Sequence, residues 1–212
     1  MSHEASSTMD QPHGHVVHVD PEGGKTSMWL FLFTELLLFG GLFLIYGVYR
    51  HMYEPAFHHA AAELNKVMGV TNTLVLLTSS LTMVLSVNSL QRNQPKRSMN
   101  FLVITLLLSA VFLVIKFFEW SAKYHHGIFP GTEHLHAMEH GEGLFFNLYF
   151  MMTGLHGIHV VIGMIVMLVV LAKIRSGAVN VNSNGILEYT GLYWHLVDLI
   201  WIFLLPLFYL TT

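Results

Sequence analysis

Residues 193–201 read Tyr193-Trp194-His195-Leu196-Val197-Asp198-Leu199-Ile200-Trp201, and they lie inside the last long apolar run of the chain, at about 190–210. A run of about twenty apolar residues is long enough to cross a bilayer once as a helix. His195 and Asp198 are three residues apart, so they share one helical face. An ionisable side chain in hydrocarbon costs at least ~2.5–3.5 kcal/mol on insertion scales, and such residues usually face other helices or a functional path. We therefore expect this face to point into a helical bundle.

Four earlier runs are also long and apolar. The predicted spans are 28–48, 70–90, 99–120, 144–172 and 190–210, and residues 1–27 before them form a flexible polar tail. Hydrophobic residues make up 53% of the 212-residue chain and charged residues only 11%, whereas a soluble domain has about 25% charged residues. The sequence predicts an all-α membrane protein in which residues 28–212 form one bundle of five transmembrane helices.

The composition excludes several classes of function. The chain has no cysteine, which excludes disulfides, thiolate catalysis and cysteine-ligated iron–sulfur or copper sites. A formal net charge of −3 does not suggest nucleic-acid binding. The start of the chain lacks the basic-then-apolar pattern of a cleaved signal, so we expect the first span to act as the insertion signal.

The basic residues predict the orientation in the membrane. Six Lys and Arg residues lie on the side of the N-terminal tail and three lie on the opposite side, with Lys116 inside a span. The positive-inside rule then places the N-terminus in the cytoplasm and the C-terminus outside. The six are Lys25, Arg92, Lys96, Arg97, Lys173 and Arg175, and the three are Arg50, Lys66 and Lys123.

Glu35 is an intramembrane carboxyl in the first predicted span. It lies about 10 Å from the predicted start of that helix at 1.5 Å per residue, beyond easy reach of the interface for a short side chain. Two interpretations remain open, a protonated or hydrogen-bonded carboxyl that joins two helices and a carboxyl that exchanges protons. Gly40 and Gly41 follow it, and we expect them to let another helix approach closely.

Two further pairs of ionisable residues occupy predicted spans. Asp198 is a second proton-supporting or buried carboxyl, and His195 is its expected partner. Lys116 and Glu119 are also three residues apart, and we count them among the buried polar residues that serve packing or lipid contact. We interpret them as an anchoring pair close to an interface, where long side chains reach the head groups. The span at 70–90 carries many small polar residues, which favour helix packing and predict a helix interior to the bundle.

Histidines provide the remaining candidate ligands. His156 and His159 share a helical face between glycines, and with His195 they define an alternative in which the chain holds its own haem or metal. The competing interpretation is packing or lipid contact, and we favour it. The tail and the 121–143 loop are rich in histidine without a regular ligand spacing, so no metal site is predicted there.

Four blocks of sequence occur in a specific order across 28–212. The blocks are Thr34-Glu35-Leu36-Leu37-Leu38-Phe39-Gly40-Gly41-Leu42-Phe43, then Phe118-Glu119-Trp120, then Thr153-Gly154-Leu155-His156-Gly157-Ile158-His159-Val160-Val161-Ile162-Gly163, and finally residues 193–201. This pattern resembles subunit III of the haem–copper terminal oxidases. Larger family members have seven helices, and this chain matches the last five, as many bacterial subunits III do.

The resemblance implies an accessory subunit of an oxidase in aerobic respiration. It implies that haem and copper lie in partner subunits and that this chain has neither. It also implies bound phospholipid, direct contact with the catalytic subunit I, subunit II in the same complex, and a place in the bacterial cytoplasmic membrane. Membership of a larger respiratory supercomplex stays open.

The resemblance also assigns expectations to individual residues. Glu35 takes the place of the family's buried carbodiimide-reactive glutamate, and His156, His159, His195 and Asp198 match its intramembrane polar residues. The two helices missing here form one wall of the lipid-filled cleft in the seven-helix form, so a cleft in this chain would need a wall from a partner.

Other functions remain open at this point. Within the family, the electron donor is cytochrome c in the leading interpretation and a quinol in the alternative, and an accessory protein of nitric oxide reductase has a similar pattern. From different classes come the intrinsic haem or metal enzyme and a proton-coupled transporter using Glu35 and Asp198. Transporters usually show internal repeats, which are not evident in this sequence.

Overall fold

The computed structural model describes residues 21–132, 135, 138–181 and 183–210, and every regular element in these ranges is a helix. In chain order they are α1 (Pro21–Met52), α2 (Glu54–Ala62), α3 (Lys66–Gln91), α4 (Pro95–His125), α6 (His140–Arg175) and α7 (Gly185–Tyr209). All except the short α2 are long and apolar enough to cross a membrane. The predicted all-α protein with five membrane spans is confirmed.

The helices extend beyond the predicted spans. α1 begins at Pro21, so the predicted tail of 1–27 is too long at its C-terminal end, and residues 1–20 lie outside the described ranges. α4 continues to His125 and α6 begins at His140. The apolar run marks only the part of a helix that crosses hydrocarbon, whereas the backbone hydrogen bonds continue into polar residues. The predicted loop from Arg50 to Gly69 likewise contains the helix α2.

Local signals explain several helix starts. The Asn65 side chain precedes α3 and accepts hydrogen bonds from the amides of Val67 and Met68 at 3.0 and 3.2 Å. It satisfies two amide groups that have no partner within the helix. Proline stands in the first turn of both α2 and α4, where its missing N–H costs no helical hydrogen bond.

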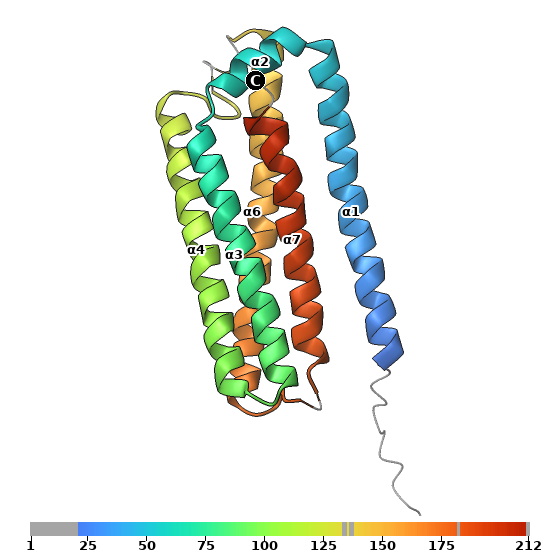
Figure 1. The fold of residues 1–212 in the computed structure, drawn as a ribbon. Helices are drawn as coiled ribbons and strands as arrows, with labels where there is room; N and C mark the ends of the chain where they lie inside the picture. Colours follow the sequence, from blue (N-terminus) through green and yellow to red (C-terminus); the bar gives the residue numbers. More distant parts are fainter. Residues whose placement is uncertain (1–20, 133–134, 136–137, 182, 211–212) are drawn as a thin grey trace, which may run out of the picture.

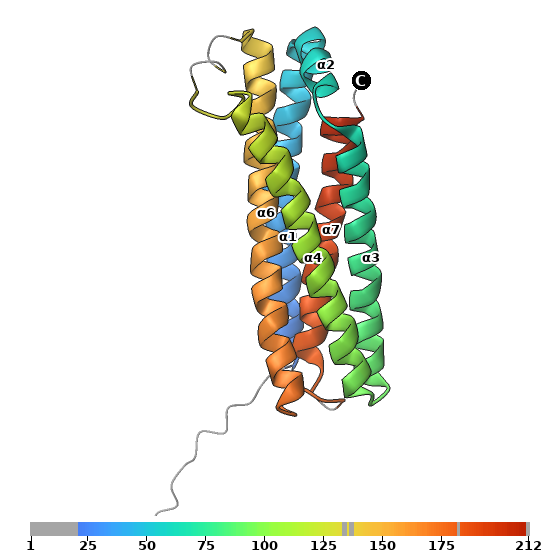
Figure 2. The ribbon, with the colours of Figure 1, turned by 90° about the vertical axis from the view of Figure 1, so that its left-hand side faces the viewer.

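Four long helices form a ring and the fifth stands beside it (Figures 1 and 2). α3 packs against α4 and α7, and α6 packs against α4 and α7, while α2 lies across one end. α1 contacts the α6 and α7 side of this ring, and only 11% of its most apolar segment is buried. The corresponding figure is 50% for α7 and 33% for α3. The most interior helix is therefore α7, while α3, which contains the 70–90 span, is buried to the same 33% as α4 and α6 and turns its small polar face toward the bundle.

Small polar residues join α3 to α4, as the sequence predicted for helix packing. The Ser86 hydroxyl donates to the Ser98 carbonyl at 2.9 Å, and the hydroxyls of Thr82 and Thr105 lie 2.8 Å apart. Ser86, Ser98 and Thr105 are fully buried. Interhelical hydrogen bonds between such residues contribute ~0.6 kcal/mol each on average in membrane proteins.

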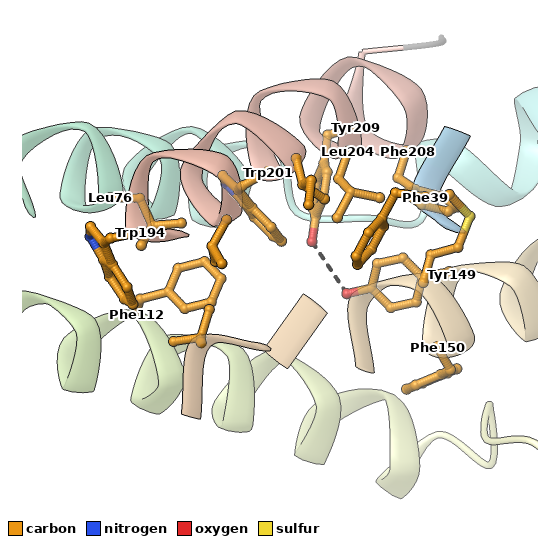
Figure 3. Packing of buried hydrophobic residues seen from close by; sticks show 14 of the residues in the cluster. Phe39, Leu76, Phe112, Tyr149, Phe150, Trp194, Trp201, Leu204, Phe208 and Tyr209 are labelled. Atoms are coloured by element: carbon orange, nitrogen blue, oxygen red, sulfur yellow. Dashed lines mark hydrogen bonds between the residues drawn. The ribbon is translucent and has the colours of Figure 1, made fainter. Parts of the chain in front are cut away.

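Aromatic side chains fill the interior along α7 (Figure 3). Trp194 and Trp201 are fully buried, and the Trp201 ring meets Phe112 of α4 edge to face at 4.9 Å. Trp194 lies so close to α6 that a Cβ at Gly163 would approach its ring to 2.9 Å. A glycine at this position lets α6 and α7 approach closely around the tryptophan.

Gly40 and Gly41 do not have the packing role that the sequence suggested within this chain. No described atom lies within 4 Å of the position a Cβ would take at either residue. α1 is instead attached to the ring through larger side chains. At one end, the Tyr46 hydroxyl donates to the Leu207 carbonyl at 2.5 Å, in the last turn of α7, where carbonyls have no partner within the helix.

Candidate functional site within the membrane helices

Glu35 of α1 meets His159 of α6. The His159 Nε2 atom lies 2.9 Å from the Glu35 Oε2 atom, and both side chains are largely buried, at 11% and 15% exposed. The two atoms are close enough to form an ion pair, but they are not aligned as in a good hydrogen bond. This contact places Glu35 and His159 at one depth in the bundle.

A second contact of His159 fixes the orientation of its ring. Its Nδ1 atom lies 2.8 Å from the Leu155 carbonyl oxygen, which only accepts, so Nδ1 carries a proton. The Nε2 atom is then the ring nitrogen that faces Glu35. The Tyr193 hydroxyl fixes the helix here by donating to the His159 carbonyl at 3.0 Å.

Lys116 and Glu119 form the pair that the sequence predicted, but they lie inside the bundle. Lys116 is 7% exposed and Glu119 is 4% exposed, and Lys116 Nζ lies 3.0 Å from Glu119 Oε2. The expectation of an anchoring pair close to an interface was therefore wrong. The neighbouring helices bury both side chains, because two tyrosines from α6 and α7 cover them.

Those tyrosines complete the hydrogen bonds of the pair. Lys116 donates to the hydroxyls of Tyr149 and Tyr209 at 3.1 and 2.9 Å, and both hydroxyls donate to Glu119 Oε1 at 2.9 and 2.5 Å. Figure 3 shows the contact between the two hydroxyls. Lys116 Nζ also lies 4.9 Å from the centre of the Trp201 ring. A buried ion pair is tolerated when its remaining donors and acceptors are satisfied in this way.

His195 and Asp198 do not form the expected pair. The His195 Nδ1 atom lies 2.6 Å from the Ser80 hydroxyl of α3. Asp198 is only 3% exposed, and neither of its carboxyl oxygens has a well-formed hydrogen bond with the described residues, although Ser80 is close enough to influence it. The partner of His195 is thus a serine on another helix, since the three-residue spacing brings the two side chains to one face without bringing their polar atoms together.

His156 lies in an aromatic pocket of the interior. It is fully buried, with its ring centre 5.7 Å from Phe112 and 5.3 Å from Trp201. Neither ring nitrogen has a hydrogen bond within the described chain. His156, His159 and His195 therefore contact different partners, and the structure does not bring them together as a ligand set.

Among the described histidines outside the spans, His59 forms an ion-pair contact. His59 of α2 approaches Glu142 of α6, with 2.6 Å between Nδ1 and Oε1. Across the described ranges, no three His, Asp or Glu side chains gather closely enough to hold a metal ion. His134, His136 and the histidines of the tail lie outside these ranges.

Sequence reasoning missed the partners of the charged residues. Tyr149 and Tyr209 stand in apolar segments and appear there as ordinary aromatic core residues, while Ser80 is one of many small polar residues on its helix. The sequence contains only an indirect signal for these partners. A lysine inside a predicted span needs several acceptors, and tyrosine hydroxyls are acceptors that an apolar segment can carry.

Comparisons with known proteins agree with the pattern of these residues. The family model described as "Cytochrome c oxidase subunit III" matches residues 4–212. A relative from Thermostichus vulcanus, "Cytochrome c oxidase subunit 3", is 30% identical over 200 residues, which cover 92% of this chain and 90% of the relative. The "Cytochrome bo(3) ubiquinol oxidase subunit 3" of Pseudomonas aeruginosa is also 30% identical over 200 residues, covering 91% and 88%.

A fused protein is among the similar sequences. The "Heme-copper oxidase subunit I+III" of Aeropyrum pernix is 26% identical over 198 residues, which cover 88% of this chain and 22% of that longer protein. The aligned region is thus a part of a much longer polypeptide whose name includes both subunits.

Proposed function

The chain belongs to the cytochrome c oxidase subunit III family, and from this premise we propose that it stabilises the catalytic subunit I of a proton-pumping haem–copper oxidase, holds phospholipid and supports proton uptake. As a member of this family it is an accessory subunit of a respiratory oxidase complex and a multi-pass membrane protein that associates with other oxidase subunits. The proposed direct partner is subunit I, with subunit II in the same complex, in a bacterial cytoplasmic membrane.

The Glu35–His159 pair carries the proposal of proton support. Its two proton-binding atoms, Glu35 Oε2 and His159 Nε2, lie 2.9 Å apart, and both side chains are largely buried. A proton taken up by a neutral imidazole beside a carboxylate forms an ion pair and not an isolated charge, which lowers the desolvation cost of holding it. A site of this kind takes up and releases protons for a neighbouring pump.

The buried Lys116 cluster supports the proposed stabilising role. It joins α4, α6 and α7 through side chains whose polar atoms bond to one another. A rigid bundle presents one fixed surface to subunit I, because its helices have no alternative set of buried hydrogen bonds to adopt.

A surface groove between α4 and α6 supports the proposal of bound lipid. It has a volume of about 380 Å³ and is lined almost entirely by apolar atoms, with Phe117 and Trp120 on one side and Gly154 and Gly157 on the other. The glycines leave room along α6 that an acyl chain would fill. Lipid would remain there through many turnovers and cover the edge of the buried cluster.

Haem and copper belong to the partner subunits in this proposal, and this chain has no redox centre. For the electron donor we propose cytochrome c. A quinol is the second candidate, because the relatives of similar identity include proteins named for each donor. The N-terminus is proposed to face the cytoplasm, so that α1 and α7 each begin on the cytoplasmic side of the membrane.

Purification from native membranes tests the function. The chain is tagged at its C-terminus and extracted gently, and its co-purifying subunits, reduced-minus-oxidised spectra and oxygen consumption are recorded together. Large histidine-rich partners with haem–copper spectra and oxygen consumption support the proposal, and cytochrome c and a quinol are then compared as donors. A lone chain with its own haem or stoichiometric metal would overturn it, and so would partners that reduce nitric oxide and consume no oxygen.

A further inference from the structure

Tyr193 of α7 contacts both helices that carry the Glu35–His159 pair. Its hydroxyl donates to the His159 carbonyl of α6 at 3.0 Å, and its ring centre lies 5.9 Å from that of Phe31 of α1. We propose that Tyr193 is a positioning residue of the pair, which holds α1 and α6 at the depth and rotation where Glu35 reaches His159. This inference rests on the proposed role of the pair in proton support and names a residue that controls the pair.

α1 has little packing of its own to fix its position. It stands outside the ring of the other long helices (Figure 1), and only 11% of its most apolar segment is buried. Phe31, Glu35 and Phe39 are spaced four residues apart, so they share one face of α1. Phe31 packs against Tyr193, and Phe39 meets the His159 ring nearly edge on at 5.4 Å. The carboxyl is therefore held between two aromatic contacts, one turn before it and one turn after it.

On α6, two hydrogen bonds fix the place and the direction of the His159 ring. The bond from Nδ1 to the Leu155 carbonyl sets the rotation of the ring, and the Tyr193 hydroxyl holds the backbone of the same residue. Nε2 then faces Glu35 at 2.9 Å. Groups that must meet at such a distance need supporting contacts, because a small shift of either helix would separate them. The hydroxyl of Tyr193 provides this support from a third helix.

Gly163 gives Tyr193 the room to reach α6. A Cβ at Gly163 would come within 3.2 Å of the Tyr193 ring, which is closer than ordinary contact. Gly163 is four residues after His159, so the ring crosses α6 one turn beyond the carbonyl to which its hydroxyl donates. Tyr193 is only 6% exposed, and this burial keeps bulk water from competing for the bond.

The Tyr193 hydroxyl also lies within the electrostatic surroundings of the pair. Glu35 is close enough for its charge to act on this hydroxyl, and His156, almost one turn before His159 on α6, is close enough to be affected by the charge of His159. These groups come from α1, α6 and α7, the three helices that meet here. Removing the hydroxyl is therefore expected to change how the pair binds protons, although no atom of the pair itself is removed.

Carbodiimide labelling of Glu35 tests the assignment. A carbodiimide adds to a protonated carboxyl, so the labelling rate of Glu35 against pH, measured by mass spectrometry on the purified complex, follows the proton on this residue. We expect Tyr193→Phe to move this pH profile by about half a unit or more, in the direction in which His159→Gln moves it. Tyr189→Phe is the matched control and leaves the profile unchanged, because Tyr189 lies one turn earlier on α7 and faces Gly24.

The double variant separates positioning from a general loosening of the bundle. If Tyr193 acts through His159, Tyr193→Phe has no further effect on the profile in a His159→Gln background. An unchanged profile in either single variant would overturn the assignment, as would a shift by Tyr193→Phe that is equally large in the His159→Gln background.

A second variant covers a failure of Tyr193→Phe to accumulate. Phe31→Leu then replaces it, since Phe31 is 42% exposed and its ring makes the contact between α1 and Tyr193. An unchanged profile in Phe31→Leu would refute the positioning role. Labelling requires no turnover, so its result is separate from that of the proposed function. A proton-to-electron ratio unaffected by Glu35→Gln would refute proton support and leave the coupling of Tyr193 to the pair intact.

Discussion

The Tyr209 hydroxyl, in the last turn of α7, donates a hydrogen bond to the buried carboxylate of Glu119 on α4. The same hydroxyl accepts from Lys116 at 2.9 Å. A residue near the C-terminus thus completes a buried ion pair made by two residues in the middle of the chain. Close packing accompanies this bond, since a Cβ at Gly69 of α3 would approach the Tyr209 ring to 2.8 Å.

Tyr209→Phe is expected to destabilise the bundle. The change removes one hydroxyl and leaves Lys116 and Glu119 each short of one partner in the interior, which costs ~1–3 kcal/mol. Thermal unfolding of the purified complex, monitored through this subunit, measures the loss. Tyr124→Phe is the matched control, because Tyr124 is 61% exposed and lies on the same helix as the pair. Equal melting temperatures for both variants would contradict the role of the hydroxyl.

Lys116→Met alone is expected to reduce accumulation of the subunit more than Lys116→Met combined with Glu119→Leu. The single change leaves an uncompensated carboxylate in the interior, at a cost of about 3–5 kcal/mol, whereas replacing both partners by apolar residues is often neutral. Accumulation of the subunit in the membrane, followed by quantitative blotting, gives the order of the variants. A double variant that accumulates less than the single one would show that the pair itself is required.

Glu35→Gln is expected to leave assembly intact and to change proton uptake. Glutamine fits the same space but does not exchange a proton with His159, so no proton passes between the two side chains. The proton-to-electron ratio and the rate of turnover-dependent inactivation in proteoliposomes measure the effect. His159→Gln and the double variant should give no more than the single change, because they remove the same pair. Leu44→Ala, 74% exposed on α1, is the control. Wild-type values in Glu35→Gln would exclude a role for this carboxyl.

Asp198→Leu is expected to cost little stability. The sequence alone suggested that this change would be more disruptive than Glu35→Gln, because His195 was the expected partner of Asp198. In the structure His195 bonds to Ser80, and the carboxyl oxygens of Asp198 have no well-formed hydrogen bond. Replacing an unpaired buried polar group by an apolar one of similar size is neutral or stabilising. A melting temperature lowered by several degrees would reveal a partner outside this chain.

Gly163→Ala is expected to weaken the contact between α6 and α7. The new methyl group would meet the Trp194 ring at 2.9 Å, and the ring is fully buried without room to move. Overpacking of this kind costs about 1–3 kcal/mol. Gly157→Ala on the same helix is the control, since no described atom lies within 4 Å of its new methyl group. If both variants accumulate equally, the close approach at Gly163 is not required.

The outcome at Lys116 and Glu119 shows how far sequence reasoning extends. Their spacing on one helix predicted the ion pair correctly, because residues three apart in a helix are neighbours. It did not predict which residues cover the pair, since the covering tyrosines are 30 and 90 residues from Glu119 in the chain. Glu35 gives the same lesson, because its partner His159 lies 124 residues further along the chain, beyond α2, α3 and α4, and yet contacts it in space.

The five membrane helices, their approximate positions and the ionisable residues inside them can all be read from the amino-acid sequence. These features follow from local physics, since the length of an apolar run and the cost of a charge in hydrocarbon depend on the segment alone. The partners of those residues depend on the fold, which joins Glu35 to His159, Lys116 and Glu119 to two tyrosines, and His195 to Ser80. Those choices depend on the rotation and depth at which each helix packs against its neighbours, which a single segment does not specify.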